Sequence, residues 1–253
     1  PHAGKAMDVS SVLPDGGRLL PSGTDVMFDN RTHWMTDVEG GNYRVFAIDG
    51  SDAQRGDATG ENMIERYCTG NFLAGQRLIY ASASGLPVGR YIFKAVAQKG
   101  ADGGVIELFA NDDRSPVTSV KVLRETEVAT DVLDQDLTVG VESGLNNACQ
   151  WVSFADVALE YQSPYMLLEE AVAASDTLTY GEDKGGALKK TADEARLLLV
   201  SGEARERMAA YHTLLDAMEQ YRLDNASVAH PVDLTVRIQN AGFDIGNTTG
   251  WTL

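Results

Sequence analysis

The sequence has few cysteines and histidines and no long apolar run, and each scarcity excludes a class of site or protein. Its 253 residues include 2 cysteines, Cys68 and Cys149, and neither has a Cys or His at the spacing of a zinc-ligand pair. The 4 histidines are scattered. No apolar stretch approaches the roughly 20 residues of a membrane-spanning helix. The sequence therefore predicts neither a zinc site nor a membrane helix.

The two cysteines leave two states open. They are either buried thiols or the two halves of one disulfide. A domain of this size can be held together by its hydrophobic core without a covalent link, which favours buried thiols.

Basic residues are also scarce relative to acidic ones. The chain has 21 Lys and Arg residues against 37 Asp and Glu residues, for a net charge of -16. Nucleic-acid binding relies on a basic surface, and docking on an anionic membrane does too. The charge therefore predicts no nucleic-acid partner and no membrane contact, and it is compatible with a neutral ligand or a cation.

The sequence motifs of several enzyme classes are missing as well. There is no Gly-x-Ser-x-Gly, no P-loop and no dinucleotide-binding fingerprint. Acidic pairs occur at Asp112-Asp113 and Glu169-Glu170. A glycosidase holds two carboxyls about 5–10 Å apart across a cleft, and adjacency in sequence does not indicate that arrangement. The sequence predicts a protein that is not an enzyme.

Residues 1–162 have the pattern of an antiparallel β-sandwich. Short runs rich in β-branched and aromatic residues are separated by Gly, Pro, Asn and Asp, and no long helical pattern interrupts them. Strands without crossover helices form antiparallel sheets. The predicted strands are 43–48, 63–68, 77–83, 90–97, 105–110, 117–123, 137–141 and 152–161.

The pattern changes to a helical one at Ser163-Pro164, since Ser followed by Pro marks a helix start. Apolar residues then recur at helical spacing, and short links imply antiparallel neighbours. Residues 163–225 are predicted to form a three-helix spacer bundle, with Ser201 as the N-cap of the third helix. The predicted helices are 164–178, 186–200 and 202–223.

The end of the chain repeats a motif from its beginning. "FDNRTHWMT" (residues 28–36) and "FDIGNTTGWTL" (residues 243–253) share Phe-Asp followed by Asn-x-Thr-x-Trp. Internal repeats mark repeated structural units. Before the second copy, Val232 to Ile238 alternate apolar and polar residues, as a half-buried strand does. We expect residues 226–253 to begin a second sandwich, and other domains of a longer chain to be neighbours of this one.

Several of these motifs, in this order, resemble galactose-binding-like jelly-roll domains, the fold of many carbohydrate-binding modules. The two Phe-Asp motifs are similar to the opening of those domains, although a Pro and a Gly are missing before Trp34. "SGLPVGRYIFKAVAQ" resembles their middle strand pair, and residues 137–161 resemble their closing strands. "LFANDDRSPV" is similar to a stretch in multi-domain glycan-handling surface proteins of gut anaerobic bacteria, where helical spacers also occur. The resemblance implies an extracellular or cell-surface bacterial protein.

The resemblance also implies a structural calcium ion held by Asp29 and Asp156, the acidic residues of the opening motif and the closing strand. Calcium takes six to eight oxygen ligands, and chain ends brought together can supply them. In the alternative, Asp29 caps a turn and Asp156 accepts backbone N–H groups. The sequence leaves both open.

A glycan site would combine aromatic platforms with planar polar side chains. Candidates in expected loops or strand ends are the aromatics Trp34, Tyr43, Tyr67 and Trp151, with Arg66, Asn71, Asn146 and Asn147 as polar partners. The alternative is that the aromatics pack in the core, as Trp34 does in many such domains.

The resulting hypothesis is a non-catalytic carbohydrate-binding or ligand-binding module of a larger secreted or surface-anchored protein. Two alternatives remain. One is an architectural or adhesive spacer without a sugar site. The other is an accessory region of a glycoside hydrolase whose catalytic domain lies outside this chain.

Overall fold

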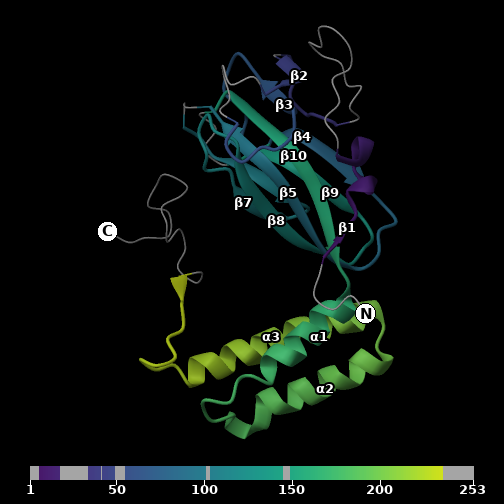
Figure 1. Ribbon diagram of the computed structural model, residues 1–253, viewed down its shortest axis with the longest axis vertical. Helices are drawn as coiled ribbons and strands as arrows, with labels where there is room; N and C mark the ends of the chain where they lie inside the picture. Colours follow the sequence, from purple (N-terminus) through teal and green to yellow (C-terminus); the bar gives the residue numbers. More distant parts are fainter. Residues whose placement is uncertain are drawn as a thin grey trace. The chain divides into compact units, whose positions relative to one another are not determined.

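The computed structural model describes residues 6–17, 34–40, 42–48, 55–100, 103–144 and 149–235. The chain divides into two compact units, one rich in strands and one in helices (Figure 1). The strand unit comprises Met7–Pro87 and Tyr91–Tyr161. The helical unit contains Val88–Arg90 and the chain from Gln162 onward.

Two antiparallel sheets in the described residues form a β-sandwich, which confirms the predicted fold class. The larger sheet has the order β2-β3-β10-β5-β8, with β1 also pairing with β10. The smaller sheet has the order β4-β9-β6-β7. The strands of the larger sheet are β1 (Met7–Asp8), β2 (Asn42–Ala47), β3 (Asn62–Tyr67), β5 (Gly89–Lys99), β8 (Arg124–Val132) and β10 (Trp151–Gln162). Those of the smaller sheet are β4 (Arg77–Ala83), β6 (Ile106–Ala110), β7 (Asp113–Pro116) and β9 (Leu137–Ser143).

Large aromatic side chains fill the space between the sheets. Trp34 is fully buried and packs edge-on against Phe154 of β10, with ring centroids 5.3 Å apart. Phe93 of β5 is also fully buried. Burying an aromatic ring removes a large apolar surface from water, so these residues contribute strongly to the stability of the sandwich.

The burial pattern of β10 changes at Asp156, whose backbone is left-handed with φ of 49°. Before it, the four residues from 152 to 155 are all buried. After it, buried and half-buried residues alternate, with Val157, Leu159 and Tyr161 buried. Both halves of this long strand thus contribute to the core.

One predicted strand is wrong. Residues 117–123 make only bridges, at Val120 and Val122, and Lys121 has φ of 57°, which breaks an extended run. Val117 and Leu123 are nevertheless buried and account for the apolar pattern. The strands on either side, β7 and β8, were not predicted. The first half of β8 is largely exposed and polar, so its strand signal is weak.

Three helices follow the sandwich and pack on one another through a separate apolar cluster. They are α1 (Pro164–Ser175), α2 (Ala187–Ser201) and α3 (Ala204–Asp224). Ser163 caps α1 as its position before Pro164 indicates, and its Oγ accepts a hydrogen bond from Met166 N at 3.3 Å. This arrangement satisfies one of the free N–H groups at the start of the helix.

The predicted cap of α3 is wrong. Ser201 is the last residue of α2, and its hydroxyl donates to the Leu197 carbonyl at 3.2 Å. Glu203 is the N-cap instead, with the extended backbone that this position requires, and its N–H donates to the Glu206 carboxylate at 2.8 Å. Two residues separate the helices, and the cap is the second of them.

The chain beyond α3 is described only as far as residue 235. Residues 231–234 are not in a strand, so the described part of the stretch from Val232 to Ile238 does not show the predicted strand. Residues 236–253, with the second Phe-Asp motif, lie outside the described residues. No helix in the described part of the chain is long and apolar enough to cross a membrane.

Candidate ligand-binding groove

The predicted ligand residues are placed in three different settings. Trp34, Tyr43 and Arg66 are buried, with exposed fractions of 0%, 7% and 1%. Tyr67 and Trp151 are half-buried, and Asn71 is exposed. Asn146, Asn147 and the predicted calcium ligand Asp29 lie outside the described residues. The described members of the predicted set therefore do not all share one setting.

Tyr43 and Arg66 meet inside the sandwich, opposite one another on β2 and β3. The Tyr43 hydroxyl donates to the Trp34 carbonyl at 2.8 Å. The Arg66 guanidinium donates to the carbonyls of Tyr67 at 2.9 Å and Val38 at 2.7 Å. Both side chains thus hold the neighbouring backbone in place through hydrogen bonds. They border a small cavity of about 440 Å³ that is also lined by Met35, Thr36, Val38, Gly40 and Tyr80.

Tyr67 and Trp151 are the two predicted aromatics that the structure brings together while leaving them accessible. They are direct cross-strand partners in the ladder between β3 and β10. Opposite residues in such a ladder have their Cβ atoms about 5 Å apart. Neither residue lines the cavities described here.

Asp156, the second predicted calcium ligand, makes the contacts that the alternative interpretation expected. Its Oδ2 accepts from the Thr59 N–H and, at 3.0 Å, from the Thr59 hydroxyl. Its Oδ1 accepts from the Gly60 N–H at 2.9 Å. No group of three or more His, Cys, Asp or Glu side chains in the described residues is arranged to hold a metal ion. The calcium site stays a prediction, because Asp29 is outside that range.

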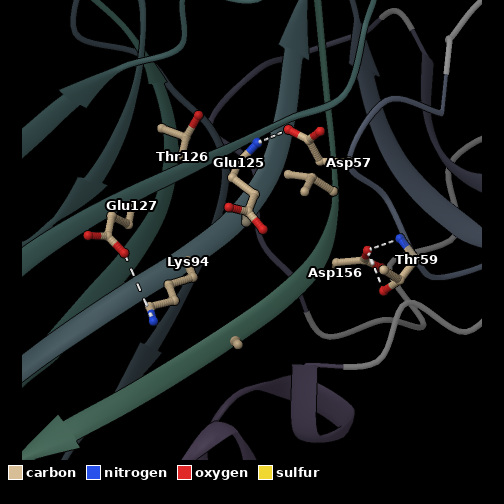
Figure 2. A pocket seen from close by; sticks show the side chains of 10 residues that line it. Asp57, Thr59, Lys94, Glu125, Thr126, Glu127 and Asp156 are labelled. Carbon is tan, nitrogen blue, oxygen red and sulfur yellow. Dashed lines mark hydrogen bonds and ion pairs between the residues drawn. The ribbon is translucent and has the colours of Figure 1, made fainter. Parts of the chain in front are cut away.

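A groove of about 570 Å³ lies against strands β5, β8 and β10 of the larger sheet, and Figure 2 shows its side chains. The strands of this sheet run side by side in the order β10-β5-β8, so residues from three segments far apart in sequence meet here. The lining residues are Asp57, Thr59, Lys94, Ala95, Val96, Glu125, Thr126, Glu127, Asp156 and Ala158.

Alternation along the strands places the polar groups of the groove. Lys94 and Val96 are two residues apart on β5, and Glu125 and Glu127 are two residues apart on β8, so each pair shares a face. Ala158 of β10 adds a small side chain to the lining. The lining thus contains both small apolar residues and long polar ones.

Three ion pairs lie at this surface. The Lys94 ammonium lies 2.8 Å from a Glu160 oxygen and 3.9 Å from Glu127, and Figure 2 shows it directed at Glu127. Asp57 accepts from the Glu125 N–H at 3.2 Å and from Arg124 at 2.7 Å. The bond from the Glu125 N–H and then the one from Arg124 lower the pKa of the Asp57 carboxyl.

The Glu125 carboxylate is available to a ligand. The residue is exposed, and its carboxylate makes no hydrogen bond or ion pair with another side chain of the described ranges. A carboxylate accepts hydrogen bonds at two oxygens, and an ammonium such as that of Lys94 donates three. Together with Glu127, these side chains suit a ligand that carries several hydroxyl groups.

Of the residues that line this groove, Asp156 alone is a predicted site residue. Lys94, Glu125 and Glu127 are charged residues on strands, and in a sequence they are indistinguishable from a solvated sheet face. The only signal is their spacing of two, which puts them on one face of their strand. That β8 lies beside β5 could not be read from the pattern, since β8 itself was not predicted.

A carboxyl whose pKa is raised lies elsewhere in the described structure. Burial, and then the neighbouring carboxylate of Glu142, raise the pKa of Glu107. These two residues are direct partners between β6 and β9 of the smaller sheet, and Arg114 pairs with Glu142. An acid catalyst needs a carboxyl with a raised pKa beside its substrate. Glu107 is not among the groove residues.

No protein-family model matches the sequence, and no curated protein matches it. Solved structures with a distant likeness include TmCBM61 in complex with β-1,4-galactotriose, 15% identical, with a TM-score of 0.41 over 61% of this chain and 97% of that one. Another is the CBM22-1 xylan-binding domain of Paenibacillus barcinonensis Xyn10C, 12% identical, with a TM-score of 0.35 over 51% of this chain and 85% of that one. A third holds the CBM51-2 and INT domains of Clostridium perfringens ZmpB with GlcNAc, 13% identical, with a TM-score of 0.30; this chain spans 44% of it, and 74% of this chain is covered.

Proposed function

We propose that this chain is a non-catalytic carbohydrate-binding module of a larger secreted or surface-anchored bacterial protein, and that a saccharide binds in the groove over β5, β8 and β10. The observation that carries the proposal is the groove itself. It is large enough for one or two sugar rings, and its lining combines carboxylates, one ammonium and small apolar side chains.

The chemistry of the lining supports a polyhydroxyl ligand. Sugar hydroxyls can donate to the carboxylates of Glu125 and Glu127 and accept from Lys94. The C–H face of a sugar ring can rest on Val96 and Ala158, which also line the groove. The groove has no aromatic lining residue, so we expect hydrogen bonds rather than ring stacking to contribute most of the affinity.

Two observations support binding without catalysis. The carboxyl with the clearly raised pKa, Glu107, belongs to the smaller sheet and does not line the groove. Asp156 uses both of its oxygens to hold Thr59 and Gly60. A carboxylate that anchors a loop is a poor nucleophile, because attack on a substrate would break those bonds.

A glycan-array screen of the whole chain, followed by titration of the best oligosaccharide, tests this function. Saturable binding with no release of reducing sugar is the expected result. A folded protein that binds no plant, host or microbial glycan would favour an architectural or adhesive spacer. Hydrolysis of a bound oligosaccharide would contradict the non-catalytic part of the proposal.

A further inference from the structure

The chain has 2 cysteines, and the fold brings both to the same end of the β3–β10 strand pair in the larger sheet. Tyr67 and Trp151 are the last paired residues at one end of the ladder between β3 and β10. Cys68 follows Tyr67 and Cys149 precedes Trp151 by two residues. The Cys68 N–H donates to the Gln150 carbonyl at 3.0 Å, so the pairing continues one step beyond the strands.

This hydrogen bond fixes the separation of the two cysteines. Residues opposite one another in an antiparallel pair have Cα atoms about 5 Å apart, and Cys149 is the residue next to the partner of Cys68. Their Cα atoms are therefore roughly 6 Å apart, which is within the range that a disulfide spans. Cysteines distant in sequence are thus within bonding reach.

Both side chains enter the same environment. Cys68 and Cys149 belong to the apolar core cluster of the sandwich, with exposed fractions of 9% and 0%. Cys149 lies outside β10, and its carbonyl accepts from Phe72 N at 3.0 Å rather than from a strand partner. Strand alternation therefore does not force the two sulfurs to opposite faces.

We infer that Cys68 and Cys149 form a disulfide when the chain folds in the presence of a disulfide oxidant. In the structure both are free thiols, and the Cys149 Sγ donates to the Trp151 carbonyl at 3.1 Å. The Cys68 Sγ likewise donates to the Gly70 carbonyl. To pair, each sulfur must give up this hydrogen bond and turn towards the other sulfur.

The oxidant is a disulfide such as glutathione disulfide. The thiolate of one cysteine attacks it, forming a mixed disulfide and releasing one glutathione thiolate. The second cysteine thiolate then attacks the cysteine sulfur of the mixed disulfide and releases the other. The two cysteines lose two protons and two electrons, and both pass to the glutathione molecules, which leave as thiols.

The bond should form before the core closes. Burial raises the pKa of the Cys68 thiol, and the thiolate is the reactive species. Cys149 is completely buried in the folded protein. An oxidant added to the native protein should therefore react far more slowly than the same oxidant present during refolding.

Refolding the full chain with reduced and oxidised glutathione tests the inference. The protein is then unfolded with iodoacetamide and without reductant, and its mass is measured. We expect that neither cysteine is alkylated and that digestion yields a cross-linked peptide containing Cys68 and Cys149. We also expect a Tm above that of the reduced protein. The Cys68→Ala, Cys149→Ala double variant should have a Tm that does not depend on the redox conditions.

Two results would overturn the inference. One is a refolded monomer in which both cysteines are still alkylated, and the other is a disulfide that joins separate chains on a non-reducing gel. If the double variant does not fold, the mass and peptide measurements on the unmodified chain still decide between these outcomes.

Discussion

The Asp156 carboxylate holds Thr59 across the surface of the larger sheet, accepting both its N–H and its hydroxyl, the latter at 3.0 Å. The backbone of Asp156 at this position is left-handed, with φ of 49°. Asp is one of the few residues with a side chain that adopts this conformation at modest cost. Asp156 therefore anchors the segment with Thr59 and Gly60 at the edge of the groove.

Replacing Asp156 with Ala should destabilise the protein by about 2–3 kcal/mol, because the N–H groups of Thr59 and Gly60 lose their acceptor and Ala disfavours a positive φ. Asp156→Asn keeps one acceptor oxygen and tolerates the backbone, so its loss should be smaller. Urea denaturation in EDTA measures both. An Asp156→Ala variant as stable as the unmodified protein in EDTA, and less stable only in calcium, would make Asp156 a metal ligand rather than a loop anchor.

Trp34 should contribute to stability rather than to ligand binding. Its side chain is fully buried, and truncating a buried aromatic costs about 3–5 kcal/mol. We expect Trp34→Ala to lower the free energy of unfolding by that amount. Trp151→Ala, at a half-buried position, is the matched control and should cost less. A loss below about 1 kcal/mol for Trp34→Ala would contradict its place in the core.

The Glu107–Glu142 pair predicts a pH dependence. The pKa of Glu107 is raised in the folded state, so the folded protein holds a proton that the unfolded chain releases. Stability from this group is therefore present below the unfolded pKa and is lost as pH rises through the folded pKa. Glu107→Gln removes this loss and should stabilise the protein by about 0.5–1 kcal/mol at pH 7, since like charges opposite one another are destabilising.

Thermal unfolding from pH 4 to pH 8 checks this prediction. The advantage of Glu107→Gln over the unmodified protein should shrink towards pH 4. Glu170→Gln, at an exposed position on α1, controls for the loss of one negative charge. An advantage that grows towards low pH would contradict the assigned direction of the pKa shift.

The sequence predicted the sandwich and the helices well where burial is one-sided and regular. Residues 77–83 were predicted as a strand with the bounds of β4, and Ser163-Pro164 marks the start of α1. It failed at residues 117–123, because buried Val117 and Leu123 belong to an irregular segment. It missed β8, whose exposed first half carries charges where a strand pattern needs apolar residues.

The candidate site was much less predictable than the fold. The chemistry of aromatic residues suggests sugar contacts. Trp34 and Tyr43, however, are buried and contribute to the hydrophobic core. Lys94, Glu125 and Glu127 line one groove only because β5 and β8 are neighbours, and strand order is a long-range property. The pairing of Tyr67 with Trp151 depends in the same way on register.

The most direct test of the central claim is calorimetric titration of the oligosaccharide that the array selects into two variants. Ala158→Trp fills the groove without changing its charge, and Ser82→Trp places the same bulk at an exposed position on β4 of the smaller sheet. We predict that Ala158→Trp weakens binding by about tenfold or more, while Ser82→Trp binds like the unmodified protein. Equal affinity of all three proteins, each shown to be folded, would contradict a saccharide site in the groove.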